Sequence, residues 1–246
     1  MTVPPAEAER ARAIMLELFP EGFEESECAD GVELAAYTDA GGEERLWSAF
    51  GGARSTDVEE GWEDRWRAFH HPVRIGPLWV GPPWEAPDPD AVAVVVDPGR
   101  AFGTGAHPTT RLCLELLLDL PRGSLLDVGC GSGVLSIAAA KLGFGPVAAI
   151  DVDPQAVEAT ARNADVNGVG LDVRLADALA DPLPSADTAV VNVALEVDEA
   201  VAARLTCGQL VLSGYLASEE PAVPGFRREA RREADGWAAD LLVRTE

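Results

Sequence analysis

The sequence predicts an α/β fold built on a mostly parallel sheet, and three neighbouring features support this prediction. An apolar run ends at Asp127, and an alanine-rich segment of helical character covers residues 134–142. Between them, glycine stands at three alternate positions: Gly129, Gly131 and Gly133. A second apolar run, residues 147–150, ends in Asp151. A strand, a glycine turn, a helix and a second strand in this order are typical of a parallel sheet whose carboxyl edge holds a nucleotide-like ligand.

The spacing of the glycines narrows the class of ligand. A dinucleotide fingerprint needs a glycine where this chain has Val134, and a P-loop needs a Lys-Ser/Thr pair that does not follow here. The carboxylate of Asp151 can instead accept hydrogen bonds from the ribose hydroxyls of an adenosine. A D-x-G-x-G-x-G run followed by an acidic strand end resembles motifs I and II of class I methyltransferases, which use S-adenosylmethionine. A glycine turn without any ligand is the alternative interpretation.

Length and composition are those of a globular protein with a sizeable core. The chain has 246 residues, of which 47% are hydrophobic, and can form one α/β domain and a smaller partner. No apolar run approaches the ~20 residues of a membrane span, and no signal-like segment opens the sequence. We therefore expect a soluble, cytoplasmic protein without a membrane partner.

The cysteines and histidines predict no metal centre. No two cysteines form a C-x-x-C pair: Cys28, Cys113, Cys130 and Cys207. The histidines do not form a metal-binding pattern with these cysteines either: His70, His71 and His107. Reduced, mostly structural thiols are expected, with neither a zinc site nor a disulfide framework.

The formal net charge of −23, from 19 basic and 42 acidic side chains, is the strongest signal in the composition. Such a surface repels phosphate backbones, so we expect no direct contact with nucleic acid. It attracts a basic partner, such as a lysine-rich protein. The alternative is that the acidity serves only solubility, because composition does not locate the charges.

Residues 1–55 are predicted to form a small α+β domain that serves recognition rather than chemistry. Its expected elements are a helix, two strands joined by an Asp-Gly turn and a second helix, over residues 4–18, 23–28, 32–38 and 41–50. A unit of this size has little core of its own.

Residues 56–90 are predicted to connect this domain to a larger one over residues 91–246. A helix is expected over residues 57–69, followed by a Pro- and Trp-rich segment with a strand-like run at residues 73–80. Two tryptophans are expected to anchor the connector against the larger domain: Trp79 and Trp84. The alternative for paired tryptophans is an aromatic cage for a methylated lysine.

The segment before the first helix of the larger domain is rich in glycine and proline, so it cannot be regular structure. It contains Phe102-Gly103-Thr104-Gly105 and ends at Thr109-Thr110, at the mouth of a helix expected over residues 111–118. A glycine-rich loop with hydroxyl groups at this place could close over a bound ligand. An ordinary connector is the alternative interpretation.

The chain resembles the bacterial PrmA family, which methylates large-subunit ribosomal protein eleven. Four motifs carry the resemblance: Phe102-Gly103-Thr104-Gly105, His107-Pro108-Thr109-Thr110, the glycine run from Asp127, and Asp151-x-Asp153-Pro154. Residues 31–37 and 72–76 also resemble the N-terminal domain and linker of that family, so the resemblance covers most of the chain. The Phe-Gly-Thr-Gly loop is its most specific part, because motif I is shared by many unrelated methyltransferases.

The resemblance implies a Rossmann-like class I methyltransferase sheet with an antiparallel C-terminal strand, preceded by a small ferredoxin-like α+β domain. We expect that domain to be truncated, because the sequence pattern starts directly at a helix, without a first strand. At the other end, a strand over residues 209–213 and an irregular segment over residues 217–224 are expected. A hairpin of residues 226–233 and 237–244 matches the antiparallel seventh strand of class I methyltransferases.

The resemblance also implies the residues that bind the cofactor. Carried over by motif, the expected contacts are Thr110, Gly129, Asp151 and Asn192. To these we add residues of the loop and the glycine turn: Phe102, Gly103, Thr104, Asp127, Gly131 and Gly133. Asp177, after a third strand at residues 173–175, is expected to bond the adenine amino group, and an exposed loop carboxylate is the competing interpretation.

Asn192 is also the candidate for positioning the acceptor, because it ends the apolar run at residues 188–191, where class I methyltransferases place motif IV. Enzymes that act on planar amide or base nitrogens typically carry Asn-Pro-Pro-Tyr there, whereas this chain reads Asn192-Val193-Ala194-Leu195. A flexible aliphatic amine fits better. The implied reaction transfers methyl groups from S-adenosylmethionine to lysine side chains or the N-terminal amine of a basic protein, with S-adenosylhomocysteine as product.

No dedicated base is expected for this reaction. A lysine amine has a pKa of about 10.4, and burial beside a positive sulfonium lowers it toward the reactive, neutral form. We interpret His107 as a residue that structures the loop, and a proton acceptor is the alternative interpretation. Two alternatives stay open: a lysine methyltransferase of another protein, and a cofactor-binding module without transferase activity.

Overall fold

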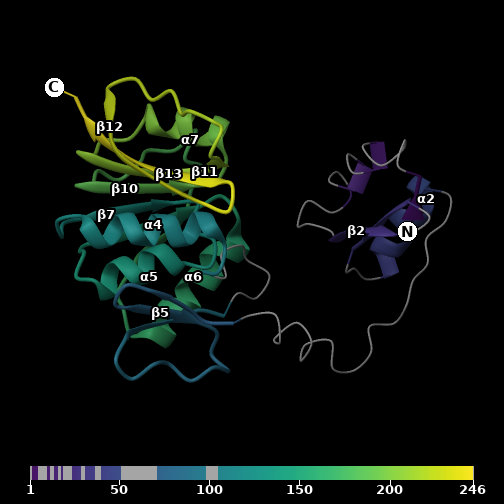
Figure 1. Ribbon diagram of the computed structural model, residues 1–246, viewed down its shortest axis with the longest axis horizontal. Coiled ribbons are helices and arrows are strands. Elements are labelled where there is room, and N and C mark those ends of the chain that lie inside the picture. Colours follow the sequence, from purple (N-terminus) through teal and green to yellow (C-terminus); the bar gives the residue numbers. More distant parts are fainter. Residues whose placement is uncertain are drawn as a thin grey trace. The chain divides into compact units, whose positions relative to one another are not determined.

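The structure is a computed structural model that describes residues 2–4, 10–11, 14–15, 18, 24–28, 31–36, 40–50, 71–97 and 105–245 (Figure 1). The chain divides into two compact units, Met1–Arg65 and Trp66–Glu246. The helix expected over residues 57–69 lies outside the described residues. The predicted domain boundaries at residues 55 and 90 stay a prediction.

The small unit is a three-stranded antiparallel sheet with helical segments. Its strand order is β1-β3-β2, with bounds Thr2–Val3, Gly31–Ala35 and Glu24–Cys28. Helix α2 covers Ala40–Phe50, as the sequence predicts. Five described side chains form its buried core: Val3, Ala11, Met15, Val32 and Leu34.

Strand β1 corrects one expectation about the small unit. Thr2 and Val3 pair antiparallel with Glu33 and Val32, so a strand precedes the first helical segment. Gly31 makes this close pairing possible, because a Cβ on Gly31 would lie 3.0 Å from the carbonyl carbon of Val3. A strand of two residues carries no periodicity, and for this reason the sequence pattern did not predict it.

The larger unit begins with a second small sheet. Its order is β4-β5-β6, with bounds Val73–Ile75, Leu78–Gly81 and Val92–Val95. The single strand-like run expected at residues 73–80 is therefore a hairpin, broken at Gly76, where φ is +53°. Trp79 is only 6% exposed, so this side chain packs in the interior and is not the wall of an open cage.

The main sheet has seven strands in the order β12-β13-β11-β10-β7-β8-β9 (Figure 1). The bounds in chain order are β7 Leu125–Val128, β8 Val147–Asp151, β9 Asp172–Leu175, β10 Thr188–Asn192, β11 Gln209–Leu216, β12 Phe226–Ala234 and β13 Trp237–Arg244. Five neighbouring strands are parallel, and β13 runs antiparallel to β11 and β12. The predicted Rossmann-like sheet with an antiparallel C-terminal strand is confirmed.

Helices cover both faces of this sheet. The bounds are α4 Pro108–Asp119, α5 Val134–Lys141, α6 Pro154–Asn167 and α7 Leu195–Ala202. Leu125 packs in one core with α4, α5 and α6, whereas Leu126 packs in a second core with α7. Successive side chains of a strand point to opposite faces, so the apolar run in β7 serves both cores.

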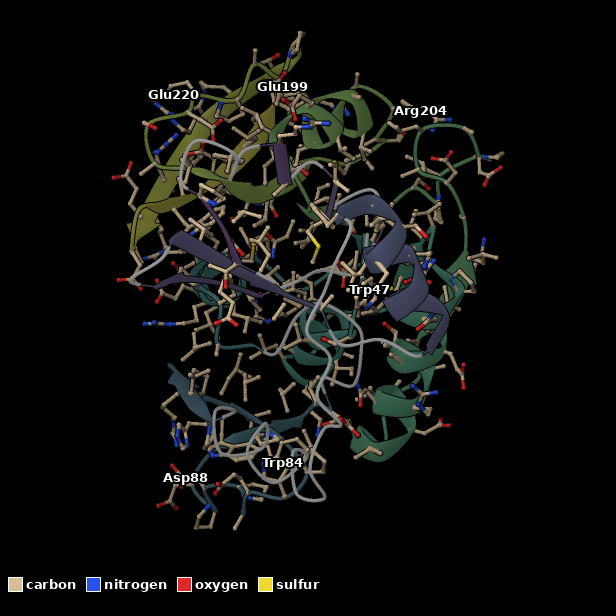
Figure 2. All side chains as sticks on the ribbon, turned by 90° about the vertical axis from the view of Figure 1, so that its right-hand side faces the viewer. Trp47, Trp84, Asp88, Glu199, Arg204 and Glu220 are labelled. Carbon is tan, nitrogen blue, oxygen red and sulfur yellow. The ribbon has the colours of Figure 1, made fainter. Side chains whose placement is uncertain are left out.

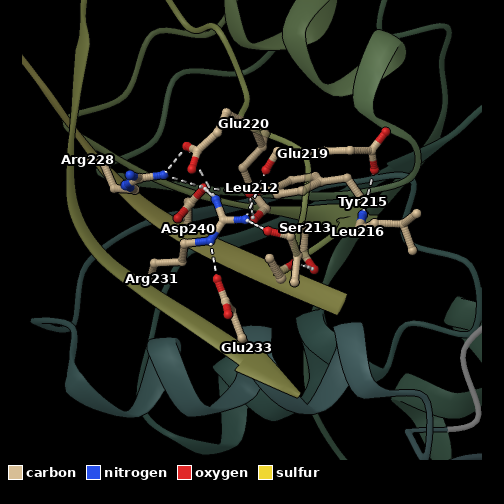
Figure 3. A network of polar contacts seen from close by, with 12 residues as sticks. Leu212, Ser213, Tyr215, Leu216, Glu219, Glu220, Arg228, Arg231, Glu233 and Asp240 are labelled. Carbon is tan, nitrogen blue, oxygen red and sulfur yellow. Dashed lines mark hydrogen bonds and ion pairs between the residues drawn. The ribbon is translucent and has the colours of Figure 1, made fainter. Parts of the chain in front are cut away.

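A polar network crosses the second face at the C-terminal hairpin (Figure 3). Asp240 is fully buried in β13 and accepts hydrogen bonds from the hydroxyl of Tyr215 at 3.0 Å and from Arg231 at 3.1 Å. Arg231 also donates to the carbonyl oxygens of Ala217 and Glu219, at 2.8 and 2.9 Å. This arginine thus holds the segment after β11, which is irregular, as its two prolines predict.

Candidate functional site

The glycine turn is bound to the neighbouring strand by its backbone. The N–H groups of Gly129 and Cys130 donate to the carbonyl oxygen of Ile150, at 2.9 and 3.1 Å. The N–H of Gly131 donates to Oδ2 of Asp151 at 2.9 Å. The parallel pairing of β7 with β8 therefore brings the turn and the acidic strand end together, as the sequence predicts.

The last glycine of the turn, Gly133, directly precedes helix α5 as its N-cap. Its φ is +82°, in the left-handed region that glycine adopts without strain. A Cβ on this residue would lie 2.8 Å from Cγ2 of Thr160 and 3.1 Å from the Cα of Thr160. The hydroxyl of Thr160 donates to the carbonyl oxygen of Gly131 at 3.0 Å, so helix α6 fixes the turn from behind.

Asp151 is partly buried, and each of its carboxylate oxygens accepts one backbone hydrogen bond. Oδ2 accepts from Gly131, and Oδ1 accepts from the N–H of Asp153 at 3.0 Å. A carboxylate oxygen has more than one lone pair, so each can still accept a hydrogen bond from a ligand hydroxyl. This arrangement fits the expected contact with a ribose.

Asp127 is the buried acid of the site, with 1% of its surface exposed. Its Oδ2 accepts from the N–H of Ser136 at 3.1 Å and from the hydroxyl of the same residue. Burial raises the pKa of Asp127 to about 6, against the opposing effect of the bonds from Ser136. Its Oδ1 is buried and makes no hydrogen bond, which leaves an acceptor beside the glycine turn for a cationic donor.

Asn163 connects the turn to the backbone that precedes the glycine-rich loop. Its side-chain amide donates to the carbonyl oxygens of Ser132 at 2.8 Å and Asp97 at 3.2 Å. Its Oδ1 accepts from the N–H of Asp97 at 3.1 Å. Sequence reasoning missed Asn163, although it lies at i+3 from Thr160 on the buried face of α6.

The glycine-rich loop is described only from Gly105 onward, so Phe102, Gly103 and Thr104 lie outside the described residues. Gly105 lies against β5 and the start of α5: a Cβ on it would lie 3.4 Å from Cβ of Val80 and 3.7 Å from Cγ2 of Val134. Thr110 is buried in the first turn of α4. Its contact with a cofactor stays a prediction.

His107 caps helix α4. Its Nδ1 lies 2.8 Å from Oγ1 of Thr109 and accepts from the N–H of Thr109 at 3.4 Å. Its ring meets the edge of Trp237, with centroids 4.9 Å apart. Burial lowers the pKa of His107, so the ring is neutral near pH 7. These contacts agree with a residue that structures the loop.

Asn192 ends β10 on the opposite side of β7 from Asp151. It lies in register with Ser213 of β11 and is partly buried. Parallel pairing of β10 with β7 puts it at the same sheet edge as the glycine turn. Its role in positioning an acceptor stays a prediction.

Asp177 follows β9 and is exposed. Its Oδ1 accepts from the N–H of Leu179 at 2.8 Å, which closes a short turn. Arg204, labelled in Figure 2, donates to the carbonyl oxygens of Ala178, Ala180 and Asp181 and so holds the same loop. A contact between Asp177 and adenine stays a prediction, beside the competing interpretation of a loop carboxylate.

Sequence reasoning also missed Asp198, a fully buried acid on α7. Its Oδ1 accepts from the N–H of Val193 at 3.3 Å. Burial raises the pKa of Asp198 to about 8. The available signal was its helical spacing, because Asp198 shares the buried face with Val201 and Ala202, at i+3 and i+4.

Membrane spans and metal clusters are both absent from the part of the chain that the structure describes. None of the described helices has the length and apolar character needed to cross a membrane. Within the same residues, no three His, Cys, Asp or Glu side chains are grouped as a metal site would require.

Comparison with known proteins places this site in a family. The family model described as "Ribosomal protein L11 methyltransferase (PrmA)" matches residues 15–243. The chain belongs to the PrmA family. A PrmA relative named ribosomal protein L11 methyltransferase, from Serratia proteamaculans, is 46% identical over 177 residues, which are 67% of this chain and 60% of the relative. One from Methylococcus capsulatus is 42% identical over 238 residues, 87% of this chain and 79% of the relative.

A solved structure agrees with the PrmA assignment. The crystal structure of a ribosomal protein L11 methylase from Lactobacillus delbrueckii subsp. bulgaricus has a TM-score of 0.64 and 29% identity. The match between the two structures covers 72% of this chain and 100% of the methylase chain. The chain spans less than two thirds of some relatives, such as the one from Edwardsiella ictaluri, of which it covers 62%.

Proposed function

We propose that the protein transfers methyl groups from S-adenosylmethionine to amino groups of ribosomal protein L11, in the cytoplasm. The observation that carries this proposal is the buried Oδ1 of Asp127, an acceptor without a hydrogen bond beside a glycine turn that is bonded to Asp151. A nucleoside with a cationic amino-acid arm matches both acids. Membership of the PrmA family supports the same ligand and the same substrate.

The residues present fit this cofactor. Asp127 would accept a hydrogen bond from the ammonium group of its methionyl part, and Asp151 would accept from the ribose hydroxyls. Asp177 would bond the adenine amino group. The remaining expected contacts are Phe102, Gly103, Thr104, Thr110, Gly129, Gly131, Gly133 and Asn192. The bound cofactor supplies an activated methyl group on a positive sulfonium, and no metal is needed for the transfer.

The protein's part in the chemistry is alignment and exclusion of water. The amide oxygen of Asn192 accepts a hydrogen bond from the acceptor amine and directs its lone pair at the methyl carbon. The cofactor, which Asp127 and Asp151 would hold, would supply its methyl carbon to this nitrogen as the carbon–sulfur bond breaks, and the positive charge would pass from sulfur to nitrogen. The methylated ammonium then loses a proton to water before any further transfer.

Charge as well as family membership supports the proposed substrate class. A protein with a net charge of −23 attracts lysine-rich partners and repels nucleic acid. Ribosomal protein L11 is the substrate that the relatives' names give. We propose that the acceptors are its lysine side chains, its N-terminal amine or both.

Transfer of radiolabelled methyl groups to a ribosomal extract, followed by mass spectrometry, tests the proposal. One labelled band, identified as ribosomal protein L11, is the expected result. A different labelled protein would replace the substrate but keep the reaction. Binding of S-adenosylhomocysteine without any label would leave only a cofactor-binding module. For substitutions of Asp127 or Asp151, an Asp165→Asn variant is a matched control, because Asp165 is an exposed acid on α6, away from the turn.

A further inference from the structure

The segment that follows Asn192 is tightly confined by its neighbours. A Cβ on Gly129 would lie 2.5 Å from Cγ2 of Val193. A Cβ on Gly214, where φ is +111°, would lie 2.8 Å from the carbonyl oxygen of Val193 and 3.0 Å from its nitrogen. The backbone of Val193 therefore passes this close to Gly214 only because that residue is glycine, and the side chain of Val193, which is 45% exposed, lies against Gly129. Val193 thus borders the same turn that would hold the cofactor.

Asp198 fixes the backbone of this segment from the other side. Helix α7 begins after Ala194, which has no side-chain group to cap the helix. The N–H of Asp198 donates to the carbonyl oxygen of Ala194 at 2.8 Å, and its Oδ1 accepts from the N–H of Val193. Asp198 thus ties the segment before α7 to the first turn of the helix, in the manner of the acid of a capping box but one position further along the helix.

The burial of Asp198 goes beyond what helix capping requires. Glu196 in the same turn is exposed, as an acid near a helix N-terminus usually is. Asp198 is fully buried, and its Oδ2 has no hydrogen-bond partner. A buried polar atom without a partner costs stability. Capping alone would be achieved at lower cost by an exposed side chain.

We propose that Asp198 is a positioning residue for methyl transfer. By holding the N–H of Val193, it fixes the turn between β10 and α7 and so the direction in which Asn192 presents its amide to the acceptor amine. This inference rests on the proposed function and deepens it. Asp198 touches neither substrate nor cofactor, and it acts through the backbone N–H groups of Val193 and Ala194.

The neutral form of Asp198 suggests a conservative variant. With a pKa of about 8, the carboxyl is mainly protonated near pH 7 and resembles an amide in charge and shape. Asp198→Asn keeps an oxygen that can accept from Val193, whereas Asp198→Ala and Asp198→Leu remove it. Glu196→Ala is the matched control, because it removes an acid from the same turn without touching Val193.

The experiment measures kcat and KM for methylation of purified ribosomal protein L11, with the Kd for S-adenosylhomocysteine by calorimetry. We expect Asp198→Ala and Asp198→Leu to lower kcat by about tenfold or more, with KM and Kd changed by less than about threefold. Asp198→Asn restores kcat to within about threefold of the parent, and Glu196→Ala stays within about twofold.

Several results would overturn the inference. Folded Asp198→Ala with a kcat within about twofold of the parent removes the role, as does a loss of kcat matched by an equal loss of cofactor affinity. So does an Asp198→Asn variant as slow as Asp198→Ala. If neither Asp198→Ala nor Asp198→Leu folds, the residue serves the fold alone and the inference is wrong. A parent that methylates nothing defeats the proposed function instead.

Discussion

The carboxylate of Asp151 accepts a hydrogen bond from the backbone N–H of Gly131 across 2.9 Å. This bond joins the end of β8 to the glycine turn after β7. The acid assigned to the ribose is therefore bonded directly to the turn assigned to the methionyl part of the cofactor. A second bond, from the N–H of Asp153, uses the other carboxylate oxygen. Replacing either oxygen by a hydrogen-bond donor would therefore remove one of these two backbone hydrogen bonds.

The variant Asp151→Asn tests this coupling. An asparagine can satisfy only one of the two backbone N–H groups, because its NH2 faces the other. We expect the Kd for S-adenosylhomocysteine to rise by about tenfold or more, which corresponds to about 1.4 kcal/mol. Calorimetry measures it, with Asp165→Asn as control. A Kd within about twofold of that control would show that Asp151 does not hold the ligand.

Gly133→Ala tests the geometry at the start of α5. The substitution forces a side chain into a left-handed conformation and against the backbone of Thr160. We expect the free energy of unfolding to fall by about 1–3 kcal/mol. Gly170→Ala is the control, because a Cβ on Gly170 would meet no atom within 4 Å and its φ lies outside the left-handed region. Urea denaturation of both variants measures the difference, and equal losses would contradict the assigned constraint.

Cofactor affinity should depend on pH through Asp127. Burial raises its pKa to about 6, so the folded protein without ligand holds a proton on this carboxyl at pH values between the ordinary value and 6. The ammonium group of S-adenosylhomocysteine favours the ionised carboxylate, so binding must displace that proton. The affinity for S-adenosylhomocysteine therefore rises with pH from about 5 to about 7 and then levels off. Calorimetry across this range measures it.

The control for that pH dependence is Asp127→Asn. An asparagine does not titrate, so the slope of log Kd against pH should disappear, while the affinity near pH 7 falls. A parent whose affinity stays constant over the same range would separate Asp127 from the charged part of the ligand. The folded state alone behaves oppositely: the raised pKa means that its stability falls as pH rises through 6.

The ion pair between Arg231 and Asp240 should matter for stability. Arg231→Met leaves a buried acid with the hydroxyl of Tyr215 as its closest remaining donor and frees the segment after β11 (Figure 3). We expect a loss of about 3 kcal/mol or more in the free energy of unfolding. The double variant Arg231→Met with Asp240→Leu should lose less, because no acid stays buried.

The control for the ion pair is Arg227→Met on the same strand. The side chain of Arg227 is 64% exposed and pairs with Glu229 at the surface, so its loss should cost about 1 kcal/mol at most. Denaturation curves of the three variants order them directly. A double variant less stable than Arg231→Met alone would show that Asp240 stabilises the sheet by itself.

The sheet could be predicted because its elements carry their own local signals. The apolar runs of β7, β8 and β10 are buried on both faces, and the glycine turn is recognisable without knowledge of distant residues. Short elements had no such signal. Strand β1 has two residues, and the hairpin of β4 and β5 depends on one glycine with positive φ.

The residues of the site also differ in whether the sequence alone could predict them. Asp127, Asp151 and the glycines were predictable from spacing, because the strand ends of a parallel sheet meet at one edge. Asp198 and Asn163 were not, because their roles depend on backbone groups of other elements. A polar residue on an apolar helix face indicates a structural or functional role only once its hydrogen-bond partners in the core are known.

Strand β13 lies between β11 and β12, although it follows both in the sequence. During synthesis the edge of β11 therefore stays unpaired until residues 237–244 have left the ribosome. Strand β12 is made before β13 but joins the sheet only through it. Such an open edge can pair with another chain. Expression yield at high synthesis rates should depend on how quickly this final strand inserts.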